Sequence, residues 1–158
     1  MKSANVLLNA AGNAKVADFG TVREGAKKGK HGTVNTHALT GLIVGTKGYM
    51  PPEYEKSGHV SDKTDSYAFS ILLLELLTGK VGLAAAALQL DEPDLFEDMQ
   101  QFVDARAGAW PAAVVEGLAA VAEQCICMHA RNRAAVRDVI PRLDEMLRLS
   151  AASGTDID

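Results

Sequence analysis

The most apolar segment of this chain reads DSYAFSILLLELLT and covers residues 65–78. Apolar side chains occupy so many of its positions that they surround the helix instead of forming one stripe. A helix of this kind is stable only where other elements cover it, which places it in the middle of a domain. Gly79 follows directly and is well placed to end the helix. We therefore predict a central helix over residues 65–78, around which the rest of the chain packs.

Two amphipathic helices are predicted downstream of this segment. The first opens at Trp110-Pro111 and the second ends near Leu149, and both repeat apolar residues at helical spacing. Residues 84–103 show a weaker helical pattern that Pro93 interrupts. Pro141 lies inside the last stripe and predicts a kink or a late helix start. The two stripes consist of Val114, Leu118, Val121, Ala122, Cys125 and Met128, and of Val136, Val139, Ile140, Leu143, Met146 and Leu147.

The first part of the chain combines a small hairpin with a long loop. Two short apolar runs, SANVLLN at 3–9 and AKVA at 14–17, flank Gly12-Asn13, which is typical of a β-hairpin. Residues 18–44 are rich in Gly, Thr, Lys and His without a sustained period, so we expect a long loop there. A turn and a short helical stretch follow at 50–54. The predicted fold class is mainly α with a small β-hairpin region.

Composition indicates one globular domain and argues against several classes of function. The 158 residues are 47% hydrophobic and 23% charged, with a net charge of −4. Neither nucleic acid nor an anionic membrane surface is therefore an expected partner. The longest apolar run, residues 71–74, is far too short to span a membrane. Cys125 and Cys127 would point to different faces of a helix and cannot pair, which predicts reduced cysteines and a cytoplasmic location.

Three polar residues lie near the ends of the predicted hairpin. Asn5 and Asp18 are thirteen positions apart, so the hairpin brings them together at one mouth, and Lys2 lies just before it. Carboxylate and amide oxygens are the ligands that Mg²⁺ prefers. Phosphoryl transfer needs metal ions, a cation on the transferring group and a residue that orients the acceptor hydroxyl. Taken alone, however, Lys2 and Asn5 are better explained as surface polar residues.

Four motifs follow one another along the chain: KSANVLL at 2–8, ADFG at 17–20, GTKGYMPPEY at 45–54 and DSYAF at 65–69. Their order and spacing resemble the eukaryotic-type protein kinase core, from the end of the catalytic loop through the magnesium-binding and peptide-positioning loops to the central helix. The resemblance implies the C-terminal lobe of the protein kinase-like α+β fold. It divides the chain into a partial kinase domain over 1–149 and a flexible tail over 150–158. Within the domain it implies an activation segment at 18–53 and a helical region at 65–149.

The class within the kinases is indicated by two features. Lys2 is similar to the catalytic-loop lysine of serine/threonine kinases, which tyrosine kinases usually lack. The peptide-positioning motif, together with LLLELLTGK at 72–80, resembles the Pelle group of interleukin-receptor-associated and plant receptor-like kinases. The resemblance therefore implies ATP-dependent phosphorylation of serine and threonine in a protein substrate, with ATP and Mg²⁺ as cofactors.

The resemblance also implies roles for single residues. Asn5 and Asp18 would hold Mg²⁺, with Asp18 bridging the phosphates of ATP. Lys2 would neutralise charge on the transferring phosphoryl group. Thr46 would brace the catalytic loop beside the acceptor site. Leu7 would lie beneath the adenine, stacked with Leu72 and Leu76.

Four more residues receive structural roles from the resemblance. Glu53 and Arg133 would form a buried ion pair that ties the activation segment to the last helices. Asp65 would accept hydrogen bonds from backbone amides of the catalytic loop; taken alone it could be only a helix N-cap, but its register with the other motifs favours the first role. Phe19 would sit in a packed column between the lobes, and on any reading we expect it in a core.

Phosphorylation sites are expected in the long loop. Thr40 is the leading candidate, because it lies six residues before Thr46, where the resembling kinases carry an activating phosphate. Thr36 and Thr33 are the next candidates. A phosphate orders a loop only where a cation meets it, and Arg23 is the expected partner.

The chain also departs from the family pattern. The catalytic base would be an Asp two residues before Lys2, and the glycine-rich loop, the ATP-anchoring Lys and its Glu partner would lie further upstream. We therefore expect either that an internal methionine has been taken as the start of the protein or that the protein is truncated there. In both cases we expect the chain to be inactive alone. Its partners would be a protein substrate and the missing N-terminal half, which would cover an apolar face of the 65–78 helix. The alternative is a truncated pseudokinase that acts as a protein-binding module.

Overall fold

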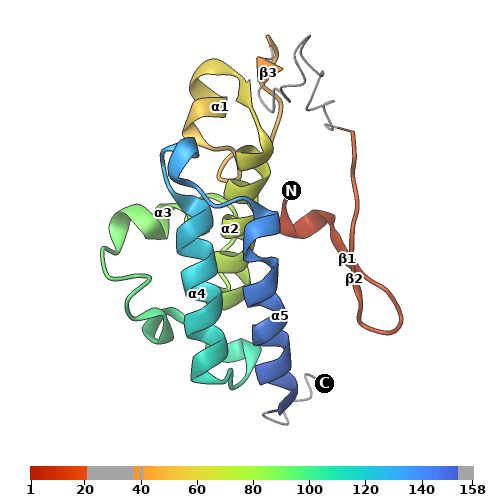
Figure 1. The fold of residues 1–158 in the computed structure, drawn as a ribbon, viewed down its shortest axis with the longest axis vertical. Coiled ribbons are helices and arrows are strands. Elements are labelled where there is room, and N and C mark those ends of the chain that lie inside the picture. Colours follow the sequence, from red (N-terminus) through yellow and green to blue (C-terminus); the bar gives the residue numbers. More distant parts are fainter. Residues whose placement is uncertain (21–37, 40, 153–158) are drawn as a thin grey trace.

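The computed structural model describes residues 1–20, 38, 39 and 41–152, and helices dominate this part of the chain (Figure 1). The helices are α1 Pro52–Ser57, α2 Asp62–Thr78, α3 Leu83–Asp91, α4 Ala112–Ile126 and α5 Val136–Ala152. Short 3-10 turns cover Ser3–Asn5, Met99–Phe102, Ala105–Ala107 and Ala130–Asn132. The strands are β1 Val6–Leu8, β2 Ala14–Val16, β3 Ala38–Leu39 and β4 His59–Val60.

The predicted central helix is present as α2, but it begins three residues earlier than predicted. Ser61 is its N-cap: the Ser61 hydroxyl accepts from the Lys63 N–H at 3.2 Å, and the Thr64 hydroxyl accepts from the Ser61 N–H at 3.0 Å. Asp65 therefore lies inside the first turn, and the N-cap alternative for this residue is wrong. At the other end Gly79 adopts a left-handed conformation, φ 65°, and closes the helix as predicted.

The core forms where α2 packs against α4, and α4 in turn against α5 (Figure 1). Ile71, Leu74 and Leu77 are fully buried on α2, and Val115 and Val121 of α4 are fully buried as well. Several neighbouring elements pack on α2, so almost every apolar position along it is covered. The absence of a single apolar stripe in its sequence predicts this arrangement.

The last helix is less covered than its apolar stripe predicts. Only Val139 and Met146 of α5 are buried, whereas Ile140 and Leu147 are exposed. This helix lies at the edge of the bundle (Figure 1), and the described residues leave these two side chains of its stripe largely uncovered. The predicted late start is wrong, because α5 begins at Val136 with Pro141 inside it.

Two other predicted boundaries need correction. Met128 does not belong to the α4 stripe, because the helix ends at Ile126 and the side chain is exposed. Residues 150–152, which were predicted to belong to the tail, lie in α5, because this helix continues to Ala152; residues 153–158 lie outside the described part.

The predicted hairpin is confirmed. Strands β1 and β2 are antiparallel, with Val6 opposite Val16, and Gly12 takes a positive φ of 77° in the turn. The Asn9 side chain closes this turn by accepting N–H groups of Ala11 and Asn13. Figure 1 shows the hairpin beside the helical bundle, not within it, and most of its apolar side chains are exposed.

A second strand pair was not predicted. Strand β3 pairs with β4 in antiparallel register, with Leu39 opposite His59. Two-residue strands are too short to show alternation in a sequence, so no periodic signal was available. Most of the predicted loop at 18–44 lies outside the described residues.

Within the described part, no single helix is long and apolar enough to cross a membrane. Helices α2 and α3, which are bent relative to each other by 88°, pass this test of length and composition only when they are counted together.

Candidate phosphoryl-transfer site

The mouth of the hairpin brings Asn5 and Asp18 together as predicted. The Asn5 side-chain nitrogen Nδ2 donates to Oδ2 of Asp18 at 3.2 Å, and the Ala17 N–H donates to the Asn5 carbonyl at 2.7 Å. Asp18 has a φ of 61°, the one positive φ among the described residues other than glycine. Backbone strain of this kind is characteristic of functional sites and must be held by the surroundings. Here the Asp18 side chain helps, since its Oδ1 accepts from the Gly20 N–H at 3.3 Å.

This donor set fits a Mg²⁺ ion that also binds phosphate. Asp18 offers carboxylate oxygens, and a half-turn of the Asn5 amide would bring its oxygen to the same side. Among the described residues no group of three or more His, Cys, Asp or Glu side chains is gathered as a metal site. Two protein ligands are nevertheless enough, because Mg²⁺ commonly keeps waters and substrate phosphate oxygens in its remaining positions.

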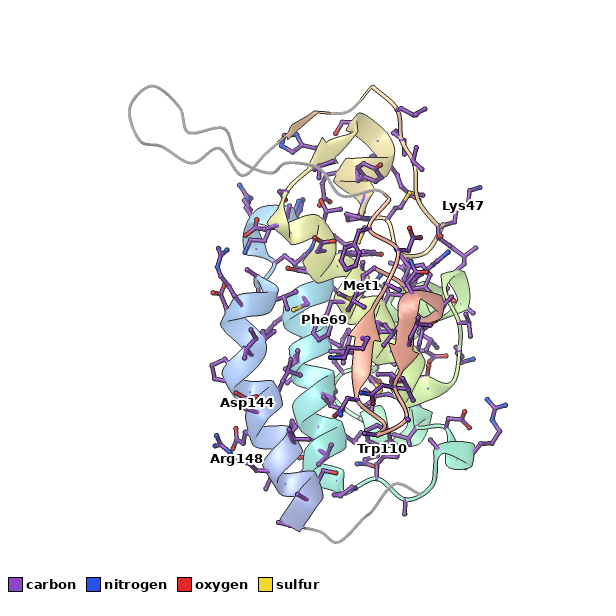
Figure 2. All side chains as sticks on the ribbon, turned by 90° about the vertical axis from the view of Figure 1, so that its right-hand side faces the viewer. Met1, Lys47, Phe69, Trp110, Asp144 and Arg148 are labelled. Atoms are coloured by element: carbon purple, nitrogen blue, oxygen red, sulfur yellow. The ribbon has the colours of Figure 1, made fainter. Side chains whose placement is uncertain are left out.

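Lys2 and Thr46 also meet, although 44 residues separate them. The Lys2 ammonium donates to the Thr46 hydroxyl at 3.5 Å, which joins the start of the chain to the loop before α1. Both residues border a cleft of about 670 Å³ that also includes Asn5 and Asp18. Figure 2 looks onto this side of the molecule, where the hairpin lies in front of the helical bundle. The structure thus gathers Lys2, Asn5, Asp18 and Thr46 around one cleft.

The predicted ion pair between Glu53 and Arg133 is confirmed. Arg133 donates through both terminal nitrogens to the two carboxylate oxygens of Glu53, at 2.7 and 3.3 Å. Its guanidinium also donates to the carbonyls of Cys127 and Lys63 and lies 5.1 Å from the centre of the Tyr67 ring. Arg133 is 2% exposed. These contacts tie α1 to the segment that precedes α5.

Sequence reasoning missed a polar group between the cleft and the core. Glu75 interrupts the apolar run of α2, and its Oε1 accepts from the hydroxyl of Tyr49 and from the N–H of Gly82. Burial raises the pKa of Tyr49, and the hydrogen bond to Glu75 adds to the rise, while contact with Ser3 opposes it. The available signal was Glu75 itself, the single acidic residue within the apolar run at 66–78.

Several predicted contacts are absent from the described part. Phe19 is 68% exposed, so the expectation of a core residue is wrong: no described element covers it, and the column that the resemblance implies would need residues outside this sequence. The stack of Leu7, Leu72 and Leu76 is also not formed as a buried set, because only Leu72 is buried, while Leu7 and Leu76 are about half exposed.

Asp65 is exposed, and its side chain makes no hydrogen bond to a described residue. The catalytic-loop amides that the resemblance gives it as partners would precede Met1. The phosphorylation candidates Thr33, Thr36 and Thr40, and their expected partner Arg23, lie outside the described residues.

Comparison with known proteins identifies the family. The protein kinase domain model matches residues 1–142. The chain is 33% identical over 163 residues to the probable serine/threonine-protein kinase PBL3 of Arabidopsis thaliana, covering 97% of this chain and 37% of that protein. It is 34% identical over 155 residues to receptor-like cytoplasmic kinase 176 of Oryza sativa subsp. japonica, covering 92% and 38%.

A third relative is wall-associated receptor kinase-like 14 of Arabidopsis thaliana, 32% identical over 162 residues, with 95% of this chain and 22% of that protein covered. The chain therefore spans well under half the length of these relatives. Because the family model matches most of its residues and its relatives are receptor-like and related serine/threonine kinases, this chain belongs to the protein kinase domain family, in the Pelle-like group.

Proposed function

We propose that this chain is the C-terminal lobe of a kinase that transfers the γ-phosphoryl group of ATP to serine or threonine hydroxyls of a protein substrate. The observation that carries the proposal is the hairpin mouth, where Asn5 and Asp18 are joined by a 3.2 Å hydrogen bond. The lobe would comprise residues 1–149. The location would be cytoplasmic, and the net charge of −4 gives no reason to expect a nucleic-acid partner.

Each residue of the cleft would have one task. Asn5 and Asp18 would hold Mg²⁺, which supplies neutralisation of the phosphate charge when it is bound. Lys2 would donate to oxygens of the γ-phosphoryl group, and its contact with the Thr46 hydroxyl would orient it. The acceptor oxygen would form the new bond to phosphorus as the bond to the β–γ bridging oxygen breaks and ADP leaves. The proton of the acceptor hydroxyl would pass to a base that the resemblance places before Met1.

The chain alone would therefore be inactive. Loss of a positioned general base typically reduces the rate by about 10²–10⁴-fold, and the other half of the nucleotide site would be absent as well. The exposed apolar side chains around the hairpin are consistent with a covering half-domain. They are Leu7, Leu8, Val16 and Phe19.

The test compares variants of the full-length protein in transfer from radiolabelled ATP to casein. Asp18→Ala removes the proposed carboxylate ligand and should abolish transfer. Asp144→Ala removes an exposed carboxylate on α5, outside the cleft, and should leave the rate unchanged. Retention of more than about a tenth of the wild-type rate by Asp18→Ala would contradict the assigned role.

The alternative is a pseudokinase that binds a protein partner without chemistry. The exposed apolar side chains of the hairpin favour this reading, because such a patch on a soluble domain marks an interaction surface. The same assay separates the two functions. A full-length wild type that transfers no phosphate, and does not bind ATP in the presence of Mg²⁺, would support the binding module.

A further inference from the structure

A second cavity lies apart from the phosphoryl-transfer cleft. It has a volume of about 520 Å³ and lies where α1, the start of α2 and the turn before α5 meet, at the α1 end of the helical bundle (Figure 1). None of the four residues that gather around the cleft lines it. Its charged and titratable lining residues are Glu53, His59, Asp62, Lys63, Arg131 and Arg137.

Both carboxylates in this lining already have cationic partners. Glu53 pairs with the buried Arg133 at 2.7 Å, and Asp62 pairs with Arg137 at 3.3 Å. Arg137 also lies 3.7 Å from Asp138, the next residue of α5. The negative charge of the cavity wall is therefore matched before the two remaining cations, Lys63 and Arg131, are counted.

Lys63 and Arg131 have no carboxylate partner in the described part of the chain. Lys63 is half-buried, and its ammonium donates to the Arg133 carbonyl at 2.8 Å, a neutral acceptor that leaves the positive charge unmatched. Arg131 is exposed and makes no hydrogen bond or ion pair with a described residue. The two come from neighbouring segments, because the turn Ala130–Asn132 packs against α2. The cavity thus carries two unmatched positive charges, on a chain whose net charge is −4.

We propose that this cavity binds a phosphorylated serine or threonine of a partner protein. A phosphate monoester carries about 1.5–2 negative charges at pH 7 and offers three strong acceptor oxygens, which match the two unmatched cations. Arg131 supplies a planar fork of donors, and Lys63 supplies a compact charge. A carboxylate carries one charge and would leave the second cation unmatched. The volume of about 520 Å³ also leaves room for peptide on either side of the phosphate.

This inference goes beyond the proposed kinase function and does not depend on it. The cavity contains none of the residues assigned to the metal ion, the nucleotide or the transferred phosphoryl group. In an active kinase it would hold a partner that already carries a phosphate. In the pseudokinase alternative the same cavity would be the site at which the partner docks.

The test measures the fluorescence anisotropy of a labelled peptide as the full-length protein is added. The peptide carries one phosphothreonine among glycine and serine residues, and two comparison peptides carry threonine or glutamate at that position. Arg131→Gln removes one charge from the cavity. The matched control is Arg148→Gln, because Arg148 is also an exposed arginine without a partner among the described residues, and it lies outside the cavity.

The phosphopeptide should bind the wild type at least about tenfold more tightly than either comparison peptide. Arg131→Gln should raise the Kd of the phosphopeptide by about tenfold or more, the effect of losing a hydrogen-bonded charge. Arg148→Gln should leave this Kd within about twofold of the wild type, since exposed charges outside the site are screened. Equal binding of the glutamate peptide, an unchanged Kd in Arg131→Gln, or an equal loss in Arg148→Gln would overturn the inference.

Two further measurements identify the ligand and its place. Inorganic phosphate at the concentration of the peptide should not displace it; displacement would show a site for free phosphate and not for a partner protein. Asp18→Ala should leave the Kd unchanged, because Asp18 lines the cleft and not this cavity. A rise equal to that in Arg131→Gln would place the phosphopeptide in the cleft and overturn the inference. None of these measurements requires phosphoryl transfer, so the proposed function can fail while this inference holds.

Discussion

Replacing Glu53 with Gln tests how much the ion pair between Glu53 and the buried Arg133 contributes to the stability of the domain. Gln keeps the shape of the side chain and one acceptor oxygen, but it removes the negative charge that faces Arg133 at 2.7 Å. Arg133 keeps its charge at all ordinary pH values and its side chain is fully buried. The variant therefore leaves a charge inside the domain without its counter-ion.

The expected loss in the free energy of unfolding follows from the groups that still contact the Arg133 guanidinium in this variant. Removing one partner of a buried pair typically costs about 3–5 kcal/mol. Glu53 is partly exposed, and Arg133 retains the carbonyls of Cys127 and Lys63 and the Tyr67 ring. We therefore expect a loss at the lower end, about 3 kcal/mol. For a domain of this size that corresponds to a fall in Tm of about 6–12 °C.

The assay is thermal and urea unfolding followed by circular dichroism, with Arg106→Gln as the control. Arg106 forms an ion pair with Asp104 at 2.8 Å, but its side chain is 82% exposed, so its loss should not measurably change the Tm. If Glu53→Gln lowers the Tm no more than Arg106→Gln does, the buried pair does not hold α1 to the C-terminal helices and this reasoning is wrong.

Two further measurements test other parts of the structure. Burial raises the pKa of the Cys125 thiol, so less thiolate forms at pH 8. Native Cys125 should therefore react with iodoacetamide more slowly than the half-buried Cys127. Equal rates for the two thiols that become no faster in urea would contradict the buried position of Cys125. The exposed apolar side chains of the chain lie on the hairpin more than on α2, where Leu76 is the exposed leucine. The double variant Leu8→Ser with Phe19→Ser should therefore reduce binding of an apolar dye more than Leu76→Ser does. The reverse order would show that the main exposed apolar surface lies on α2 and not on the hairpin.

The sequence determined the elements whose signal is local. The apolar run at 65–78 was enough to place a central helix, because side chains apolar on all sides can be stable only inside a domain. The end of that helix was readable at Gly79, since a left-handed residue closes it. The thirteen-residue separation of Asn5 and Asp18 across a turn was enough to predict that they meet. The partnership of Glu53 and Arg133, by contrast, came from family resemblance and not from any local pattern.

Only the tertiary structure decided which faces are covered and which distant groups meet. The α5 stripe has the same spacing as that of α4, yet Ile140 and Leu147 are exposed, because periodicity records how apolar a face is and not whether a neighbour packs on it. The start of α2 depended on whether Ser61 or Asp65 caps the helix, two residue types with similar capping strength. The contact of Glu75 with Tyr49 and Gly82 joins three segments, and an acidic residue in the middle of an apolar run reveals that it needs donors without revealing which residues provide them.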